Sequence, residues 1–305
     1  MGSENQKRRL ILIVAALFSA AVSLFAQVQG EQRDSLLRLI SASYIEQAEQ
    51  GDDFVRKAVE ATFLHNGTYL MADSSVWSQN TNIINCMGHV RLLQGDTELT
   101  SEKLDYLVDE DLAQFRGALV QLRDKQDNML RTKILDYNTK DSVAVFRGGA
   151  SMRSSDGQII ESDEGHYFNA RNLFSFEGNV NMYTDSVFVR ADSLHYLSDV
   201  NKAEFVSPID FWKDDNMLSA SGGWYSRPDN IFFFSGDVRG LTRDQESWSD
   251  TLYFYRSTND VLMRGHVQIQ DSTRSTAAVS DYLFYKDTLS KVTLRDNAAV
   301  ALWSE

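Results

Sequence analysis

Hydrophobic and polar residues alternate along most of the chain, and the alternating stretches recur at a fixed interval. Residues 250–269 contain the clearest copy, with Phe254 in a first stretch and Gly265 in a second. Alternation with a period of two is typical of a strand that buries one face. The polar residues 257–260 between the stretches include Asn and Asp, which favour turns. This segment therefore predicts two strands joined by a tight turn.

The same unit occurs eight times. In each copy an aromatic position stands eleven residues before a glycine-type position. Successive glycine-type positions lie 29 to 31 residues apart, at residues 88, 117, 148, 178, 207, 236, 265 and 296. A fixed period in this range indicates a repeat architecture. The glycine predicts a bend or bulge where a side chain would not fit, and Ser207-Pro208 in its place predicts an irregular fifth unit.

Two columns of apolar residues flank the glycine-type position. The column two residues before it contains Cys86, Phe115, Phe146, Phe176, Phe205, Phe234, Met263 and Leu294. The column two residues after it contains Val90, Leu119, Ala150, Val180, Ile209, Val238, Val267 and Ala298. Residues two apart lie on one face of a strand, so stacked units align both columns into apolar ladders on a single dry face. The sequence therefore predicts an all-β, solenoid-style stack of antiparallel strand pairs with about 29 residues per unit.

The start of the chain is predicted to be a targeting segment. Residues 1–26 combine a basic stretch, an apolar stretch and a plausible cleavage point after Ala26, as in a signal peptide. An uncleaved membrane anchor is the alternative, and either interpretation predicts export. Residues 27–53 are predicted to be an N-terminal segment that caps the stack, and residues 54–305 to form the repeat domain. Residues 34–50 also show helical spacing, so their secondary structure stays open.

Composition and charge exclude several classes of function. The net charge of −13 argues against a nucleic-acid partner, because phosphate binding needs a clustered basic face. Cys86 is the only cysteine, so an internal disulfide cannot form, and its apolar column predicts a small buried hydrophobe.

The residues that could carry chemistry recur in every unit. His89 and His266 follow the glycine and are predicted to be solvated, whereas His166 and His195 are predicted to lie side by side on adjacent rungs. Two histidines without a third ligand make a weak metal site. The recurrent acidic residues before the aromatic position, such as Asp250, are predicted to satisfy backbone groups at a bend. Because catalytic residues normally occur once, we expect no enzyme, no metal and no cofactor.

The units resemble those of the OstA-like family, which includes the lipopolysaccharide-transport protein LptA. The resemblance rests on the repeated elements 191–196, Ala-Asp-Ser-Leu-His-Tyr, and 176–180, Phe-Glu-Gly-Asn-Val, and covers residues 54–302. It implies a taco-like β-jellyroll in the periplasm whose apolar interior holds the acyl chains of lipopolysaccharide (lipid A). It also implies end-to-end strand addition to other jellyroll transport proteins or to a second copy. The residues it implies as groove lining are Val90, Phe115, Phe146, Phe176, Val180, Phe205, Phe234, Val238, Met263 and Val267.

Three alternatives stay open from the sequence. An exported β-solenoid scaffold or adhesin would use the phenylalanine columns only as a core. A membrane-anchored, LptC-like partner would share the jellyroll and keep its N-terminal anchor. A β-helical polysaccharide-cleaving enzyme would need an acid–base cluster at one rung, and the sequence shows none. The first alternative and the lipid carrier differ in whether the apolar seam is open.

Overall fold

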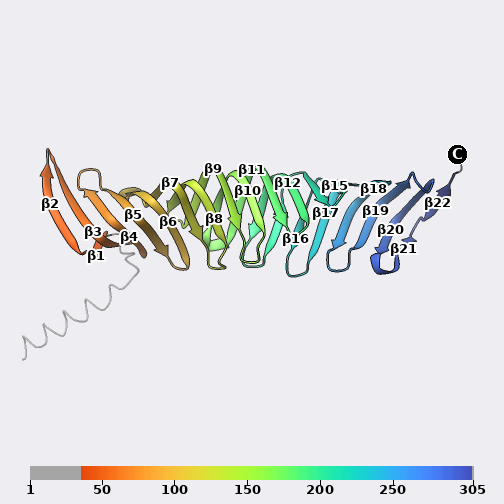
Figure 1. The fold of residues 1–305 in the computed structure, drawn as a ribbon, viewed down its shortest axis with the longest axis horizontal. Coiled ribbons are helices and arrows are strands. Elements are labelled where there is room, and N and C mark those ends of the chain that lie inside the picture. The colour runs from red at the N-terminus through yellow and green to blue at the C-terminus, as the bar shows by residue number, and fades with distance from the viewer. Residues whose placement is uncertain (1–35, 304–305) are drawn as a thin grey trace, which may run out of the picture.

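The computed structural model describes residues 36–303, which form one long antiparallel sheet folded along its length. Figure 1 shows the strands following one another in chain order, from β2 and β3 at one end to β21 and β22 at the other. All 22 described strands belong to this sheet, which confirms the predicted all-β, repeat-built jellyroll. The predicted targeting segment, residues 1–26, lies outside the described residues. Within residues 36–303, no helix has the length and apolar character needed to cross a membrane.

The strands of the N-terminal half are β1 (Arg38–Ser41), β2 (Tyr44–Gln50), β3 (Asp53–His65), β4 (Thr68–Ser78), β5 (Ile83–Gln94), β6 (Thr97–Leu107), β7 (Leu112–Arg123), β8 (Met129–Asn138), β9 (Val143–Arg153), β10 (Ile159–Phe168) and β11 (Leu173–Thr184). Those of the C-terminal half are β12 (Val187–Leu197), β13 (Lys202–Phe205), β14 (Ile209–Lys213), β15 (Asn216–Ala220), β16 (Gly222–Ser226), β17 (Ile231–Leu241), β18 (Gln245–Tyr255), β19 (Asp260–Asp271), β20 (Thr276–Lys286), β21 (Lys291–Arg295) and β22 (Ala299–Leu302). Three one-turn 3-10 helices complete the described elements: η1 (Val108–Glu110), η2 (Asn169–Arg171) and η3 (Asp287–Leu289).

The first strands settle the open question about residues 34–50. Residues 38–41 and 44–50 form β1 and β2, and both strands pair antiparallel with β3. The helical spacing of this segment therefore does not produce a helix in its described part, because a neighbouring strand supplies hydrogen bonds to its backbone.

A bulge near the middle of most long strands folds the sheet. In β19, Gly265 and His266 have φ angles of 76° and 46°, and the pairing register shifts between Arg264 and Val267. Bulges of this kind add residues to one strand and bend it. The bulges of successive strands form a line that we call the crease. On one side of the crease the strands end in the turns that contain η1, η2 and η3, which we call the first lip. On the other side they end at turns such as 185–186, the second lip.

The recurrent acidic residues lie at this crease, as predicted, but they bond side chains there. The Asp250 carboxylate lies 2.9 Å from Nδ1 of His266, and Asn179 donates a 2.6 Å hydrogen bond to Asp163. Both partners directly follow the bulge glycine. Equivalent contacts join His89 to Asp73 and Asn297 to Asp281. Within residues 36–303, no three His, Cys, Asp or Glu side chains are grouped so that they could hold a metal ion.

The apolar columns face the space between the two halves of the sheet, with two exceptions in the second column. Leu119 was expected inside but is 48% exposed, and the fully buried Val120 takes its place. The reason is a longer bulge in β7, where Arg116 pairs with Ile134 and Val120 pairs with Thr132. Three residues of β7 therefore lie opposite one residue of β8, which shifts the inward position by one. Ala298, near the end of the second column, is exposed as well.

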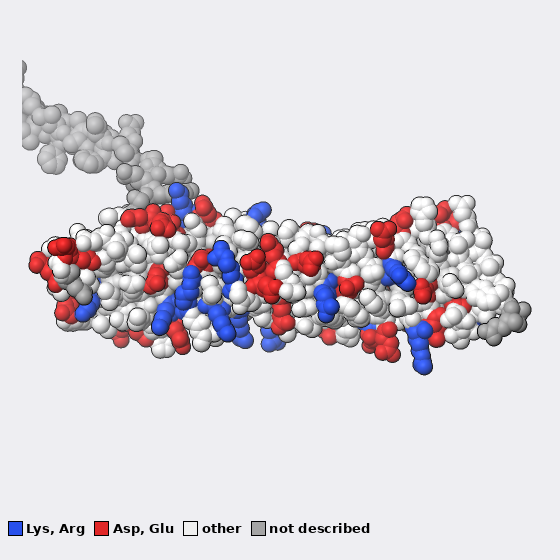
Figure 2. Space-filling model, turned by 90° about the horizontal axis from the view of Figure 1, so that it is seen from above, with Lys and Arg blue, Asp and Glu red and all other residues white. Residues whose placement is uncertain are grey.

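The outer surface carries charges of both signs. Figure 2 shows Lys and Arg side chains interspersed with Asp and Glu on the face seen from above. Several of them pair across strands, as Glu98 does with Arg91 and Arg123. On the side shown, the basic side chains are mixed with acidic ones and do not form a separate face.

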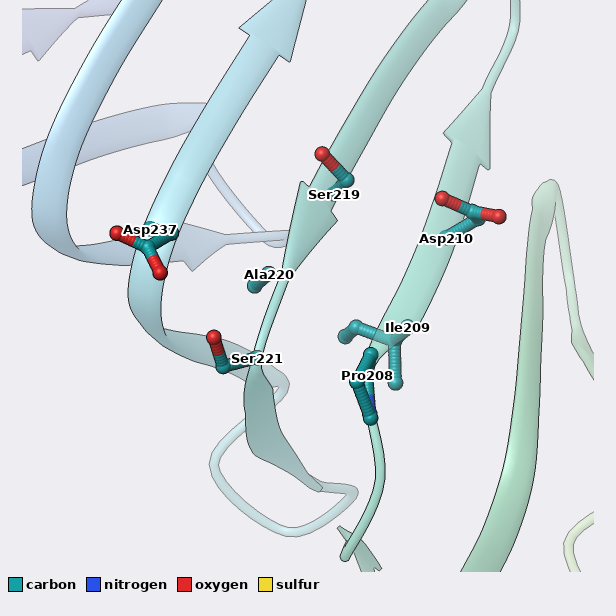
Figure 3. A pocket seen from close by; sticks show the side chains of 7 residues that line it. All are labelled: Pro208, Ile209, Asp210, Ser219, Ala220, Ser221 and Asp237. Atoms are coloured by element: carbon teal, nitrogen blue, oxygen red, sulfur yellow. The ribbon is translucent and has the colours of Figure 1, made fainter.

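The fifth unit is irregular, as Ser207-Pro208 predicts. β13 ends at Phe205 and β14 begins at Ile209, so this strand is interrupted at the crease where its neighbours only bulge. The next strand is interrupted too, between Ala220 and Gly222. A small cavity of about 280 Å³ lies at this break. Figure 3 shows Pro208 and Ile209 on one side of it and Ala220 and Ser221 on the other.

Replacing Gly265 by alanine is expected to destabilise the crease. A Cβ at this residue would lie 2.2 Å from Oδ2 of Asp250, and its φ of +76° disfavours any side chain. We expect a loss of about 1–3 kcal/mol, measured as a lower denaturant midpoint. Gly117→Ala is the matched control, because its Cβ would meet nothing closer than 3.8 Å, and it should change stability by less than about 0.5 kcal/mol. Equal losses in both variants would contradict this account.

At the crease, His266 makes the stability of the fold depend on pH. The hydrogen bond that His266 donates to the Asp250 carboxylate, and then the charge of that carboxylate, raise the pKa of His266 above its ordinary value of 6.5. The folded state thus favours the protonated imidazole. The stabilisation of the fold by this group is present below pH 6.5 and is lost as the pH rises through the raised pKa. Asp250→Asn should return the pKa to about 6.5, as followed by NMR titration of the labelled imidazoles. An unchanged His266 pKa in this variant would refute the assignment.

Candidate functional site

The interior between the two halves of the sheet is filled by side chains along most of its length. The ten residues implied as groove lining all lie there, and none is more than 4% exposed. Their rings pack against one another, with 5.9 Å between the ring centroids of Phe146 and Phe176. The structure therefore brings these residues into one interior. Only Phe234 and Met263 among them also line the large cavity described below, and a lipid contact for the ten stays a prediction.

A row of tyrosines closes this interior beneath the first lip. The five side chains come from the aromatic position of successive units and are at most 2% exposed: Tyr106, Tyr137, Tyr167, Tyr196 and Tyr225. The Tyr106 hydroxyl lies 2.6 Å from Nδ1 of His65, and Tyr137 donates to the Gln94 side chain at 2.5 Å. His65 and Gln94 both belong to the second lip. Burial raises the pKa of Tyr106 and of Tyr137 to about 12, so both hydroxyls stay protonated and join the lips from inside.

Polar contacts also join the two lips at the surface. Asn66 donates to Asp111 at 2.5 Å, and Gln94 donates to the Thr139 carbonyl at 2.6 Å. Farther along, Ser198 donates to Gln126 at 3.2 Å. Because buried and half-buried polar groups need partners, these pairs favour a closed seam.

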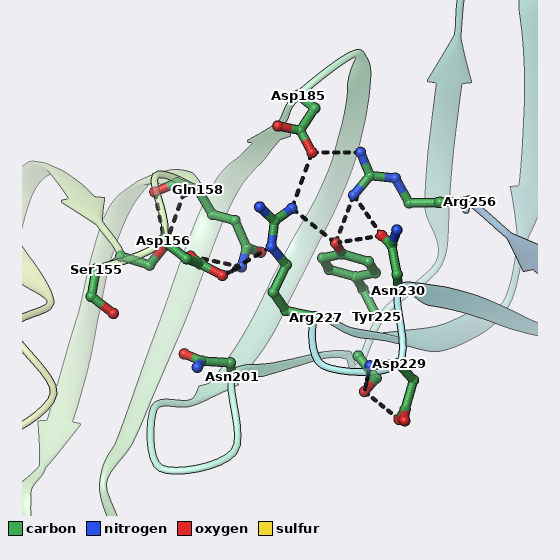
Figure 4. A network of polar contacts seen from close by, with 12 residues as sticks. Ser155, Asp156, Gln158, Asp185, Asn201, Tyr225, Arg227, Asp229, Asn230 and Arg256 are labelled. Atoms are coloured by element: carbon green, nitrogen blue, oxygen red, sulfur yellow. Dashed lines mark hydrogen bonds and ion pairs between the residues drawn. The ribbon is translucent and has the colours of Figure 1, made fainter.

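The last contact between the lips is a cluster of charged side chains, shown in Figure 4, that we call the Asp185 cluster. Asp185, on the second lip, accepts from Arg227 at 3.0 Å and from Arg256 at 2.7 Å, both on the first lip. Arg227 also pairs with Asp156 at 3.1 Å, and Arg256 donates to the Tyr225 hydroxyl at 2.6 Å. The hydrogen bonds from Arg256 and then Arg227 lower the pKa of Asp185, which keeps it charged.

Beyond the Asp185 cluster the lips separate and a large cavity begins, which we call the C-terminal groove. Its volume is about 770 Å³. Apolar side chains from both halves of the sheet form its floor: Phe211, Leu218, Phe234, Leu252, Phe254, Met263, Ile269 and Leu283. Polar side chains of both lips form its rim, including Lys213, Asn216, Thr242, Gln245, Arg274, Asn259, Asp287 and Ser290. Within residues 36–303, no hydrogen bond or ion pair joins the two lips across this groove.

The groove begins where the row of tyrosines ends. Tyr106 and Tyr137 reach the second lip, whereas Tyr167, Tyr196 and Tyr225 donate to asparagines of the first lip. The aromatic position of the next unit is Phe254, which has no hydroxyl and which lines the groove. Tyr285, one unit later, donates to Asp287 of its own lip at 3.2 Å. The sequence contained this signal, because Phe254 follows five tyrosines in the same column. The alternation of apolar and polar residues does not reveal it, since Phe and Tyr fill the same inward position.

The rim cations of the groove are paired with carboxylates of the same lip. Lys213 lies 3.0 Å from Asp214, and Arg274 lies 3.0 Å from Asp271. Lys213 also lies 5.9 Å from the centre of the Phe254 ring, over the mouth of the groove. The rim therefore offers charged groups of both signs above an apolar floor, an arrangement suited to an amphiphile.

The histidines take no part in the groove. The side chains of His89 and His266 are 92% and 85% exposed, which confirms that they are solvated. His166 and His195 do not lie on adjacent strands as expected, because Ser175 of β11 pairs with both and separates them. The error arose because each repeat contributes two strands, so equivalent residues of neighbouring units are two strands apart.

Comparisons with known proteins give the family of this chain. No curated protein matches this chain. Among solved structures, the chain is similar to LptH from Pseudomonas aeruginosa, described as the LptA-homologous periplasmic component of the lipopolysaccharide transport device, at 9% identity. That match covers 49% of this chain and 96% of LptH, with a TM-score of 0.23. The sequence model of the OstA-like protein family matches residues 32–192, just over half of the chain, as the repeated elements predicted. The chain therefore belongs to the OstA-like family.

Proposed function

We propose that this protein carries lipopolysaccharide through the periplasm and holds its acyl chains in the C-terminal groove. The observation that supports this most directly is the groove itself, an apolar floor of about 770 Å³ open between two polar lips. This volume falls in the range of binding pockets for small molecules and lipids. Each methylene removed from water contributes about 0.8 kcal/mol, so an apolar trough can hold acyl chains without any catalytic group.

Membership of the OstA-like family supports transport over catalysis. In this proposal residues 1–26 direct export, residues 27–53 cap the sheet, and residues 54–305 form the carrier domain. The anchored, LptC-like form would use the same groove and differ only in keeping its N-terminal segment in the membrane.

The C-terminal end of the sheet supports the proposal that several jellyrolls join into a bridge. β21 and β22 pair with β20 on one side, and no strand within residues 36–303 pairs with their other side. Val300 and Leu302 are 59% and 76% exposed along this edge. An edge with free backbone groups and apolar side chains can accept a strand from another jellyroll protein or from a second copy.

The filled interior is the feature that the scaffold alternative would explain equally well. A scaffold needs a packed core and no opening, and the sheet has such a core from β5 to β13. The open groove distinguishes the two functions, because a scaffold gains nothing from an apolar surface exposed to water.

The groove predicts where lipid can be captured. A photoreactive phenylalanine analogue at Phe254, on the groove floor, should crosslink to lipopolysaccharide added to the purified full-length protein. The analogue at Tyr253 is the matched control, because this neighbouring side chain points to the outer face of the same strand and its ring packs against that of Phe233, with 4.7 Å between the centroids. The products are identified by immunoblotting for lipopolysaccharide. Capture at both residues, or only at Tyr253, would refute the groove, and capture at neither would favour the scaffold.

A further inference from the structure

The Asp185 cluster lies at the boundary between the filled interior and the C-terminal groove. On its N-terminal side, tyrosine hydroxyls and lip contacts close the seam. On its other side, the second-lip turn 214–215 lies next to groove-lining residues, and among the described residues no hydrogen bond or ion pair joins this turn to the first lip. Phe254, two residues before Arg256, lines the groove. The cluster is therefore the contact that sets where the groove ends.

The cluster is built so that it can separate without leaving a buried charge alone. The Asp185 side chain is 60% exposed, so water can replace its two arginine partners. The Arg256 side chain is only 10% exposed, but it keeps the Tyr225 hydroxyl at 2.6 Å and the Asn230 side chain at 3.1 Å. Arg227 keeps Asp156. Asp185 is the exposed partner in both ion pairs, so its side chain can leave for water while the two arginines keep the hydrogen bonds of the first lip and Asp156.

Aromatic rings form the wall between the groove and the interior behind the cluster. Phe211 lines the groove, and its ring centroid lies 5.1 Å from those of Phe232 and Phe234 and 6.3 Å from that of Phe254. Phe232 and Phe205 do not line the groove and are at most 4% exposed. The two regions are thus separated only by side chains that touch through van der Waals contacts, and a movement of Phe211 would connect them.

The strand that carries Phe211 is interrupted at the crease, where a movement of this strand would have to bend it. Phe211 lies on β14, which pairs with β12, while β15 pairs with β17. At the crease itself both strands are interrupted, at residues 206–208 and at Ser221. Pro208 has no amide hydrogen, and Ser207 accepts from the backbone of Asp192 in place of a regular strand pair. The small cavity of Figure 3 lies beside this hairpin. Fewer backbone hydrogen bonds at these two points make them natural hinges.

We infer that the Asp185 cluster is a latch: its release lets residues 187–191 of β12 and the β14–β15 hairpin paired with them swing together on the crease, which lengthens the C-terminal groove toward Phe205. The lipid-accessible length of the sheet is then variable, with the closed seam as its resting state. A bound acyl chain shifts this equilibrium, because only the open form offers it the additional apolar surface. This inference rests on the proposed function, since it concerns the same groove.

The test combines a latch variant with two photoreactive positions. Asp185→Asn removes the charge at an exposed residue with little change in shape. Capture of lipopolysaccharide at Phe205 should rise by about twofold to fivefold in this variant, the range expected for an exposed ion pair, while capture at Phe254 stays constant. Asp127→Asn is the matched control, because Asp127 is a 77% exposed second-lip carboxylate that pairs with Arg123 of its own lip. It should leave both signals unchanged.

A measurement without lipid separates the latch from the proposed function. In Asp185→Asn, the amides of β12 and β14 should exchange hydrogen faster than in the unmodified protein and in Asp127→Asn. Unchanged exchange would overturn the latch, whatever the crosslinking result. Faster exchange without additional capture at Phe205 would overturn the longer groove while leaving capture at Phe254 intact. Loss of capture at Phe254 in every protein would instead refute the proposed function.

Discussion

The bend at the bulge glycine is the constraint on which this fold depends. It gives each strand two halves that face one another, so one sheet encloses an interior without a second sheet. At Gly265 the bend needs a positive φ and leaves no room for a Cβ, because the Asp250 carboxylate lies directly against the glycine. That carboxylate also bonds the next side chain, His266. The recurrent Asp and Gly therefore act together at the bend, and this arrangement is repeated along the crease.

Closure of the seam depends on a different set of groups. A buried tyrosine hydroxyl costs free energy unless it finds a partner. Tyr106 and Tyr137 find theirs on the opposite lip, which holds the two lips together. At Phe254 this requirement is absent, and the lips separate there. A difference of one oxygen atom in a repeated column thus coincides with the change from a packed core to an open groove.

Because of these two features, the interior is filled along most of the sheet and open at its C-terminal part. The bend depends on backbone conformation at the crease and recurs along the sheet, whereas closure depends on side-chain contacts that differ from unit to unit. The irregular rung at Ser207-Pro208 lies next to the point where closure fails, so an interrupted strand and an open groove occur together. For a carrier this combination is useful, because an acyl chain must be both shielded from water and released.

The sequence by itself determined the repeat, the strand pairs, the position of the bends and the family. These features depend on local alternation, on residues that permit unusual backbone angles and on a period read directly along the chain. Only the tertiary structure decided which parts of the interior are filled and which are open. It also showed that Leu119 turns outward, because β7 contains one residue more than the pattern requires. Opening is decided by contacts between residues about 30 to 70 positions apart, such as Asp185 with Arg256. A periodic pattern places each residue on a face of its strand, but it does not say which turns of the two lips meet.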